Sequence, residues 1–132
     1  MKFSHIALNC RDIDLTQAFY VQHFGFQVSR VLPLEQGQKI VFLKRDDVYL
    51  ELFGSDIQVN RPFPDGHHAV GILRHLAFQV DSVDEVLATM GQGAKVTLGP
   101  LEFDAFIPGW KTVWLEDPDG TVVEVSQGYR DA

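Results

Sequence analysis

The stretch that decides the fold is TVWLEDPDGTVVEVS, residues 112–126. Two apolar, β-branched runs flank the turn from Asp117 to Gly120, in which proline presets φ and glycine accepts a positive φ, so the stretch predicts a β-hairpin. Glu124 is unusual because it is an acid within an apolar strand. Burying an unpaired carboxylate costs several kcal/mol, so Glu124 is expected to have a cation, a hydrogen-bond donor or a metal as its partner.

A second stretch repeats this arrangement earlier in the chain. The segment IVFLKRDDVYLELF, residues 40–53, aligns without a gap with residues 113–126 when it is shifted by 73 positions. The shift places Phe42 on Leu115 and Glu51 on Glu124. Two apolar hairpins that carry an acid at the same place predict an internal duplication.

The composition of the chain excludes several classes of protein. Its 132 residues are 45% hydrophobic, which predicts one soluble domain, residues 1–132, with a core of its own. The formal charge is −7 and no cluster of Lys and Arg stands out, so neither nucleic acid nor a membrane surface is an expected partner. Cys10 is the only cysteine and no apolar run resembles a signal or membrane-spanning segment, so we expect a cytoplasmic protein without disulfides.

The first half of the chain predicts a strand, a helix and three further strands. In the opening strand, His5 and Asn9 fall on one face because side chains alternate. In the helix, Asp12 or Asp14 caps the start and Gly25 marks the end. The expected apolar side of this helix consists of Leu15, Ala18, Phe19 and Phe24. The five predicted elements occupy residues 3–9, 12–25, 26–34, 39–45 and 48–53.

The second half repeats this pattern after a segment rich in proline and glycine. Ser82 and Glu85 form a capping-box motif at the start of its helix, and Gly91 follows the helix. This helix is expected to bury Val83, Val86, Leu87 and Met90. The predicted strands occupy residues 73–80, 94–98 and the two arms of the hairpin, with a long loop at 99–111. The two modules therefore cover residues of about 1–56 and 72–128, joined by a linker at about 57–71.

Four side chains with metal-binding chemistry occupy equivalent places in the two modules. His5 and His75 lie on the first strand of each module, and Glu51 and Glu124 lie on the last. Their strand faces are mostly small or polar while the opposite faces are apolar, so these faces are expected to line a cavity. Two imidazoles and two carboxylates suit one divalent metal, and this ligand set is compatible with Ni, Zn, Co, Mn and Fe. An octahedral ion would keep two further positions for water or a bidentate substrate.

Each of these residues taken alone has a simpler interpretation. A single histidine on a strand is more often a hydrogen-bonded structural residue, and a single glutamate more often lies on a solvated edge. Only the four together, at equivalent positions, favour a metal site. His23, His67 and His68 lack such a pattern and are expected to be surface residues of a helix or a loop.

With their surroundings, these positions resemble the vicinal oxygen chelate superfamily, which includes glyoxalase I, methylmalonyl-CoA epimerase, fosfomycin-resistance transferases, extradiol dioxygenases and bleomycin-resistance proteins. The resemblance covers nearly the whole chain. It implies an α+β fold in which two βαβββ modules form a curved mixed sheet around a metal cavity, commonly in a homodimer. Besides the four candidate ligands, it is carried by the motifs His5-Ile-Ala-Leu, Ala18-Phe-Tyr-(x)₄-Gly-Phe-x-Val28, His75-Leu-Ala-Phe and Leu115-Glu-Asp-Pro-Asp-Gly.

Within the superfamily, the ligand set is most similar to that of glyoxalase I. That enzyme has the order His, Glu, His, Glu, which stands here as His5, Glu51, His75 and Glu124. The dioxygenases and fosfomycin enzymes resemble a His, His, Glu triad, and methylmalonyl-CoA epimerase resembles a His, Gln, His, Glu set. The chain departs from glyoxalase I where that family anchors glutathione, because it has Asn9 in place of an Arg and Ser55 in place of an Asn.

The resemblance implies a metal-dependent, glyoxalase I-like lyase or isomerase. Its small-molecule substrate would hold two adjacent oxygens on the metal and react through a metal-stabilised enediolate. Glu124 is the expected general base, with Glu51 as its partner from the other module. The alternatives are an extradiol dioxygenase or fosfomycin-type transferase that uses only His5, His75 and Glu124, and a non-catalytic protein that sequesters a small molecule such as an antibiotic.

The substrate pocket is expected to draw on Asn9 and on the long loop. That loop carries the aromatic residues Phe103, Phe106 and Trp110, which suit an apolar pocket wall or a lid. The alternative is that these aromatic side chains only pack the loop onto the rest of the protein.

Overall fold

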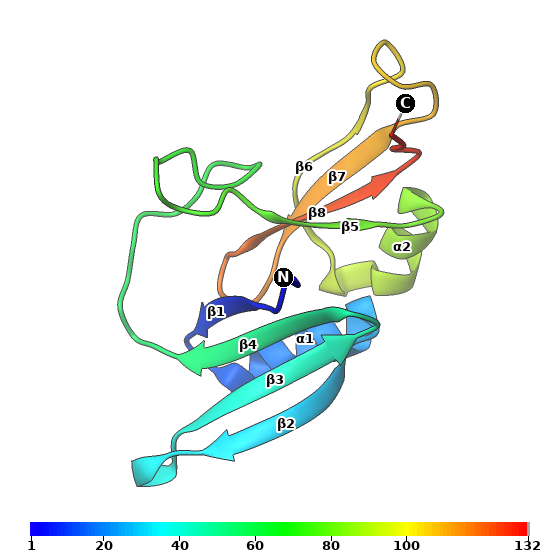
Figure 1. Ribbon diagram of the computed structural model, residues 1–132. Helices are drawn as coiled ribbons and strands as arrows, with labels where there is room; N and C mark the ends of the chain where they lie inside the picture. Colours follow the sequence, from blue (N-terminus) through cyan, green and yellow to red (C-terminus); the bar gives the residue numbers. More distant parts are fainter. Residues whose placement is uncertain (132) are drawn as a thin grey trace. The chain divides into compact units, whose positions relative to one another are not determined.

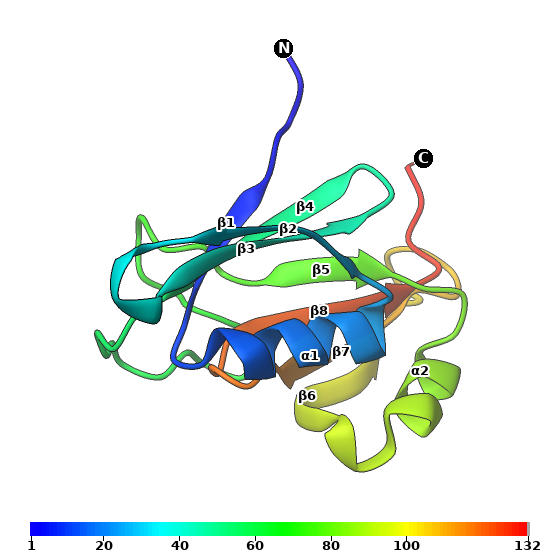
Figure 2. The same ribbon diagram turned by 90° about the horizontal axis from the view of Figure 1, so that it is seen from below.

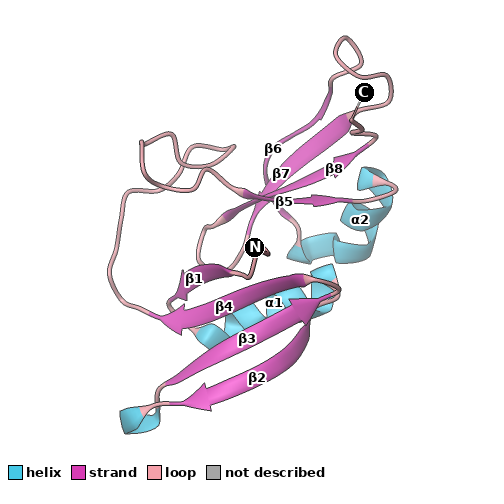
Figure 3. Ribbon diagram, viewed as in Figure 1, coloured by secondary structure: helices cyan, strands magenta, loops and turns pink. Residues whose placement is uncertain are grey.

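The element order β-α-β-β-β occurs twice along the chain (Figure 1). The computed structural model describes residues 1–131, and the chain divides into two compact units, Met1–Val59 and the part from Asn60 onward. Each unit contains one copy of the repeated order, as the sequence predicts, and Figure 3 distinguishes its helices from its strands by colour. No helix among the described residues has both the length and the apolar character that crossing a membrane requires.

The first unit is a four-stranded mixed sheet with one α-helix. The strand order is β1-β4-β3-β2, in which β1 runs parallel to β4 and the other neighbours are antiparallel. A 3₁₀ turn, η1 (Glu35–Gly37), lies between β2 and β3. The elements are β1 (Ile6–Cys10), α1 (Ile13–Phe24), β2 (Gln27–Pro33), β3 (Lys39–Arg45) and β4 (Val48–Gly54).

The second unit has the same topology. Its strand order is β5-β8-β7-β6, with β5 parallel to β8 and the remaining pairs antiparallel. The elements are β5 (Leu76–Gln79), α2 (Val83–Met90), η2 (Gly91–Gly93), β6 (Lys95–Glu102), β7 (Lys111–Glu116) and β8 (Val122–Gln127). The predicted loop at 99–111 is therefore too long, because β6 continues to Glu102 and β7 begins at Lys111.

The sheet of the first unit has one buried, apolar face and one face that carries the candidate ligands. In the first unit, Leu8, Leu43, Leu50 and Leu52 are buried on one face of the sheet, and α1 contacts β2, β3 and β4. Figure 2 views this sheet nearly edge-on, with α1 on one side of it. The alternate residues carry the candidate ligands on the other face, as strand alternation requires.

The helices begin and end where the sequence predicts, and α1 buries Phe19 and Phe24 but not the other two residues expected on its apolar side. The Asp12 side chain accepts hydrogen bonds from the backbone amides of Asp14 and Leu15, and Gly25 adopts the left-handed conformation at φ 68°. Leu15 is 59% exposed, so its expected place in the core is wrong. Ala18 is also exposed, since the buried residues of α1 are Thr16, Phe19, Tyr20 and Phe24.

The two hairpins differ by one residue from the gapless alignment. Phe42 lies opposite Glu51 in the first unit, and Trp114, not Leu115, lies opposite Glu124 in the second. The difference arises at the turn, since β3 and β4 are joined by two residues and β7 and β8 by five. A slip of one residue reverses the face of a side chain, so Trp114 and not Leu115 shares the face of the glutamate.

Candidate metal centre

In the first unit, strand pairing brings His5 to Glu51. Ala7 of β1 lies beside Glu51 of β4, and His5 precedes β1 on the same face. The His5 Nε2 atom is 3.5 Å from Glu51 Oε1. The Glu51 side chain is 16% exposed and that of His5 is 38% exposed, so the pair faces accessible space.

The second unit repeats this pair with closer contact. Ala77 of β5 lies beside Glu124 of β8, and His75 occupies the position two residues earlier. The His75 Nε2 atom is 2.8 Å from Glu124 Oε2, and the two side chains are 23% and 15% exposed. The structure therefore brings the four predicted ligands together as two His–Glu pairs, one in each unit.

The second ring nitrogen of each histidine also has a partner. His75 Nδ1 is 2.8 Å from the backbone carbonyl oxygen of Asp65, which can only accept, so this nitrogen carries the proton and donates. His5 Nδ1 is 2.7 Å from the Ser4 hydroxyl. A histidine that donates from Nδ1 while neutral leaves a lone pair on Nε2, which is the form that binds a metal.

The pair in the second unit has room for a shared cation. His75 Nε2 and Glu124 Oε2 lie 2.8 Å apart. A proton on Nε2 or a metal ion between the two atoms makes this contact favourable. Two ligands about 2.1 Å from one ion are about 3.0 Å apart at a right angle and about 3.4 Å apart at a tetrahedral angle. The measured 2.8 and 3.5 Å fit one shared ion for each pair.

Each unit alone supplies two ligands. Within either unit, the residues that the structure describes include no group of three or more His, Cys, Asp and Glu side chains that could hold a metal ion. One ion held by all four ligands thus remains a prediction from the sequence.

Asp65 organises the segment that precedes β5. Its carboxylate lies 2.7 Å from His68 Nε2 and accepts a hydrogen bond of 2.6 Å from Arg74 Nη2. The hydrogen bond with His68, followed by that with Arg74, lowers the pKa of the Asp65 carboxyl from 3.8 to about 2. The same residue holds His75 through its carbonyl oxygen, so one aspartate links His68, Arg74 and His75.

Sequence reasoning missed this role for Asp65. The sequence predicts a linker or an ordered loop for this segment, and a surface position without a function for His68. His68 is indeed exposed, with its ring stacked on Phe63 at 4.3 Å. The Asp65-Gly66 turn was visible in the sequence, but its contact with His75 spans ten residues and no local pattern indicates it.

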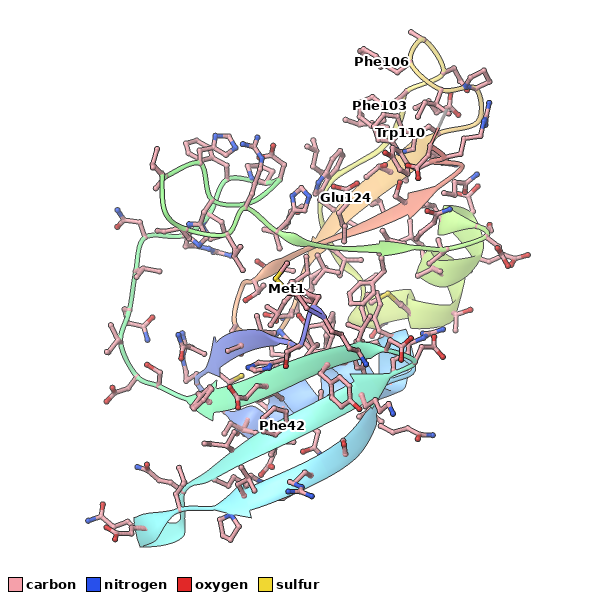
Figure 4. The ribbon with its side chains drawn as sticks, viewed as in Figure 1. Met1, Phe42, Phe103, Phe106, Trp110 and Glu124 are labelled. Atoms are coloured by element: carbon pink, nitrogen blue, oxygen red, sulfur yellow. The ribbon has the colours of Figure 1, made fainter. Side chains whose placement is uncertain are left out.

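The aromatic residues of the β6–β7 loop are divided between two environments. Phe103 contacts both Trp110 at 5.1 Å and Trp114 at 6.3 Å, measured between ring centroids. Trp110 donates a hydrogen bond of 2.8 Å from Nε1 to the Ser126 hydroxyl of β8. Phe106 is 78% exposed, and Figure 4 shows it toward the tip of the loop with Phe103 and Trp110 nearer the sheet.

Two of the three loop residues therefore pack onto the sheet that carries Glu124. Phe106 is free to meet a ligand, and its assignment to a substrate pocket stays a prediction. Asn9 is exposed at the end of the ligand face of β1, opposite Phe53 of β4, and its assignment likewise stays a prediction.

The comparison with family models shows the superfamily to which the chain belongs. A model of the Glyoxalase/Bleomycin resistance protein/Dioxygenase superfamily matches residues 2–125. The chain belongs to this superfamily, and the expected fold of two βαβββ modules with mixed sheets is confirmed.

Individual relatives support the same assignment. The chain is 32% identical to the uncharacterized protein YwkD of Bacillus subtilis, covering 92% of each chain. It is 28% identical to the mitochondrial methylmalonyl-CoA epimerase of Mus musculus, covering 96% of this chain and 72% of the relative. The crystal structure of a glyoxalase family protein from Enterococcus faecalis is 35% identical and has a TM-score of 0.74, covering 95% of this chain and 96% of the other.

A more distant structure has the same fold and contains a metal. The fosfomycin resistance protein FosX from Listeria monocytogenes, complexed with Mn(II) and sulfate, has a TM-score of 0.72 at 20% identity, covering 97% of this chain and 93% of the other. None of these four relatives is named as glyoxalase I, so that narrower assignment remains a prediction.

Proposed function

We propose that the protein is a divalent-metal-dependent enzyme that moves a proton on a small substrate with two adjacent oxygens. The observation that carries this proposal is the His75–Glu124 pair, in which an imidazole nitrogen and a carboxylate oxygen face each other at 2.8 Å. The equivalent pair of His5 and Glu51 in the first unit strengthens it. Two unrelated structural residues would not be expected to recur at equivalent places in both modules.

His5, Glu51, His75 and Glu124 would hold the ion. A divalent ion supplies positive charge that stabilises the negative charge developing on the substrate oxygens as a proton leaves carbon. The ligand set suits Mn, Fe, Co, Ni and Zn alike, and the Mn(II) complex of FosX shows that this fold accommodates one of them.

Contacts at Nδ1 of the two histidines keep their Nε2 atoms available for a metal ion. The Asp65 carbonyl oxygen holds the proton of His75 on Nδ1, so that Nε2 stays free to act as a ligand. The Ser4 hydroxyl has the corresponding place beside His5 Nδ1. Both contacts also fix the orientation of the rings, which reduces the cost of ordering the site when the ion binds.

Glu124 is the proposed general base. Its carboxylate is largely buried and lies opposite Trp114, which is only 8% exposed, so little water competes for it. A carboxylate that takes a proton from carbon and returns it must reach both the ion and the substrate. Glu51 has the equivalent position and is the second candidate.

The site to which the proton returns separates two reactions. Return to the neighbouring carbon gives the isomerisation of glyoxalase I, which the His, Glu, His, Glu order favours. Return to the opposite face of the same carbon gives an epimerisation. The similarity to methylmalonyl-CoA epimerase over 96% of the chain supports this second candidate, as does the presence of Asn9 and Ser55 where glyoxalase I anchors glutathione.

The first test combines elemental analysis with a turnover screen. We expect the purified protein to carry a divalent metal, or to gain thermal stability from added Mn, Co, Ni or Zn. The metal-loaded protein is then tested with the methylglyoxal–glutathione hemithioacetal and with methylmalonyl-CoA in D₂O. Deuterium at the reacting carbon indicates proton transfer, and the substrate that reacts decides between isomerase and epimerase. A protein that carries no divalent metal as purified and gains no thermal stability from any of these metals contradicts the proposal.

The role of Glu124 is tested by Glu124→Gln, which keeps the shape of the side chain but cannot accept the proton. We expect kcat to fall by about 100-fold or more with much of the metal retained, because general base catalysis contributes about 10²- to 10⁴-fold. Glu102→Gln is the matched control, since Glu102 is an exposed residue at the end of β6 in the same unit. Unchanged turnover in Glu124→Gln would exclude Glu124 as the base.

A further inference from the structure

The first unit contains a pocket on the face of its sheet that carries the candidate ligands. The pocket has a volume of about 460 Å³ and includes His5. Its apolar walls are formed by Phe3, Leu32, Phe42 and Tyr49. A pocket of this volume accommodates a small organic molecule, and His5 places it at the proposed metal site.

Lys2 and Arg30 give this pocket a positive charge. Apart from His5, they are its only charged lining residues, although the chain has a net charge of −7. No carboxylate among the described residues pairs with either of them. Other cations of the chain do have such partners, as Lys39 has Asp14 and Arg61 has Glu116. What distinguishes Lys2 and Arg30 is that both line the same largely apolar pocket.

A β-bulge turns Arg30 toward the pocket. The pairing of β2 with β3 shifts between Val28 and Arg30, so that Ser29 is the extra residue. Without the shift, Arg30 would lie opposite Val41, which is completely buried. With it, Arg30 lies opposite Phe42, which in turn lies opposite Glu51. The backbone of Arg30 is thus two strand spacings, about 10 Å, from that of Glu51.

The second unit lacks the cation at the equivalent place. Its β6–β7 pairing has a corresponding shift between Val96 and Leu98, and Leu98 lies opposite Trp114 in the row that contains Glu124. The backbone arrangement is therefore common to both units, whereas the positive charge belongs only to the first. The internal duplication therefore does not explain why a positively charged residue occupies position 30.

We propose that Lys2 and Arg30 form an anion-binding subsite that holds a phosphate or carboxylate group at the distal end of an apolar small molecule. That this molecule is the substrate rests on the proposed function, whereas the binding of the anion does not. The subsite would orient the substrate across Phe42, with its reacting oxygens toward His5 and Glu51. Charge-assisted hydrogen bonds from Arg30 favour such a group because its guanidinium matches the geometry of both anions.

The test measures binding to protein from which metal has been removed with EDTA. The probes are phenyl phosphate, phenylacetate and, as a neutral analogue, phenol, each titrated into ¹⁵N-labelled protein and followed by amide chemical shifts. We expect saturable shifts at Ser4, Ser29 and Arg30 with at least one anion, and binding of phenol that is weaker by at least about tenfold. The stronger of the two anionic probes identifies the preferred group.

Three variants test whether anion binding depends on the positive charge of Arg30. Arg30→Met should weaken anion binding by about tenfold, whereas Arg30→Lys should keep most of it. Lys95→Met removes an exposed cation of β6 outside the pocket and should change nothing. No saturable binding at millimolar concentration, equal binding of phenol, or unchanged binding in the Lys2→Met/Arg30→Met double variant would each overturn the subsite. Anion binding in a protein that shows no turnover would leave the subsite in place and refute only the proposed enzyme.

Discussion

At His75, the contacts of the two ring nitrogens determine which nitrogen can bind a metal ion. The Asp65 carbonyl oxygen accepts a hydrogen bond from Nδ1, and Glu124 faces Nε2. Neither contact involves a sequence neighbour. The consequence is that a residue of the loop before β5 fixes the orientation of a proposed metal ligand.

Asp65 also predicts a pH dependence of stability. Its pKa is lowered to about 2 in the folded chain from 3.8, so its ionised form stabilises the fold above about pH 4 and this contribution is lost as the pH falls through 2. Asp65→Asn should therefore cost about 1 kcal/mol near pH 7, after allowance for solvent screening, and little at pH 2. Urea unfolding at several pH values measures this difference. A cost that is the same at pH 7 and pH 2 would contradict the assignment.

At the scale of elements, strand register and turns place the side chains. The bulge at Ser29 directs Arg30 to the pocket face, and the longer β7–β8 turn makes Trp114 the cross-strand neighbour of Glu124. In the loop before β5, Gly66 has a φ of 122° and its backbone packs against that of Arg74. These features position the site without contributing any ligand to it.

Gly66→Ala tests whether this loop supports His75. A Cβ atom at Gly66 would lie 1.8 Å from the Arg74 carbonyl oxygen, and this backbone cannot move without shifting the residue next to His75. We expect a loss of about 2 kcal/mol of stability, from backbone strain, together with weaker stabilisation by metal. Differential scanning calorimetry with and without metal measures both.

Gly71→Ala is the matched control in the same loop. Gly71 also has a positive φ, of 87°, but no heavy atom of its described surroundings lies within 4 Å of an added Cβ. The Gly71→Ala variant should lose some stability through backbone strain, but metal should stabilise it as much as it stabilises the unchanged protein. Equal losses of metal response in the two variants would show that the Gly66 contact does not support His75.

At the scale of the whole molecule, the two units contain equivalent pairs of candidate ligands. If His5, Glu51, His75 and Glu124 hold one ion, that ion links residues from both halves of the chain. A ligand that binds only the folded state raises stability by about 2.7 kcal/mol at one hundred times its dissociation constant. Metal should therefore raise the unfolding temperature, and EDTA should reverse the gain.

Single-ligand variants distinguish one shared ion from two separate sites. With one shared ion, His5→Ala and His75→Ala should each abolish most of the metal-induced rise in unfolding temperature. Additive, partial losses would instead indicate an independent site in each unit. Thermal unfolding followed by circular dichroism, at saturating metal, provides the measurement, and His23→Ala on α1 provides the matched control.

The sequence by itself determined the repeated β-α-β-β-β order, the cap at Ser82, a cap at either Asp12 or Asp14, and the strand faces that carry His5 and Glu124. These follow from local rules, since caps and alternating side chains depend only on near neighbours in the chain.

Only the tertiary structure decided the bulge before Arg30, the pairing of Trp114 with Glu124, and the hydrogen bond between Asp65 and His75. Each depends on which backbone groups of distant residues pair with one another. A shift of one residue in such pairing reverses the face of a side chain while leaving the pattern of apolar and polar residues within each strand unchanged.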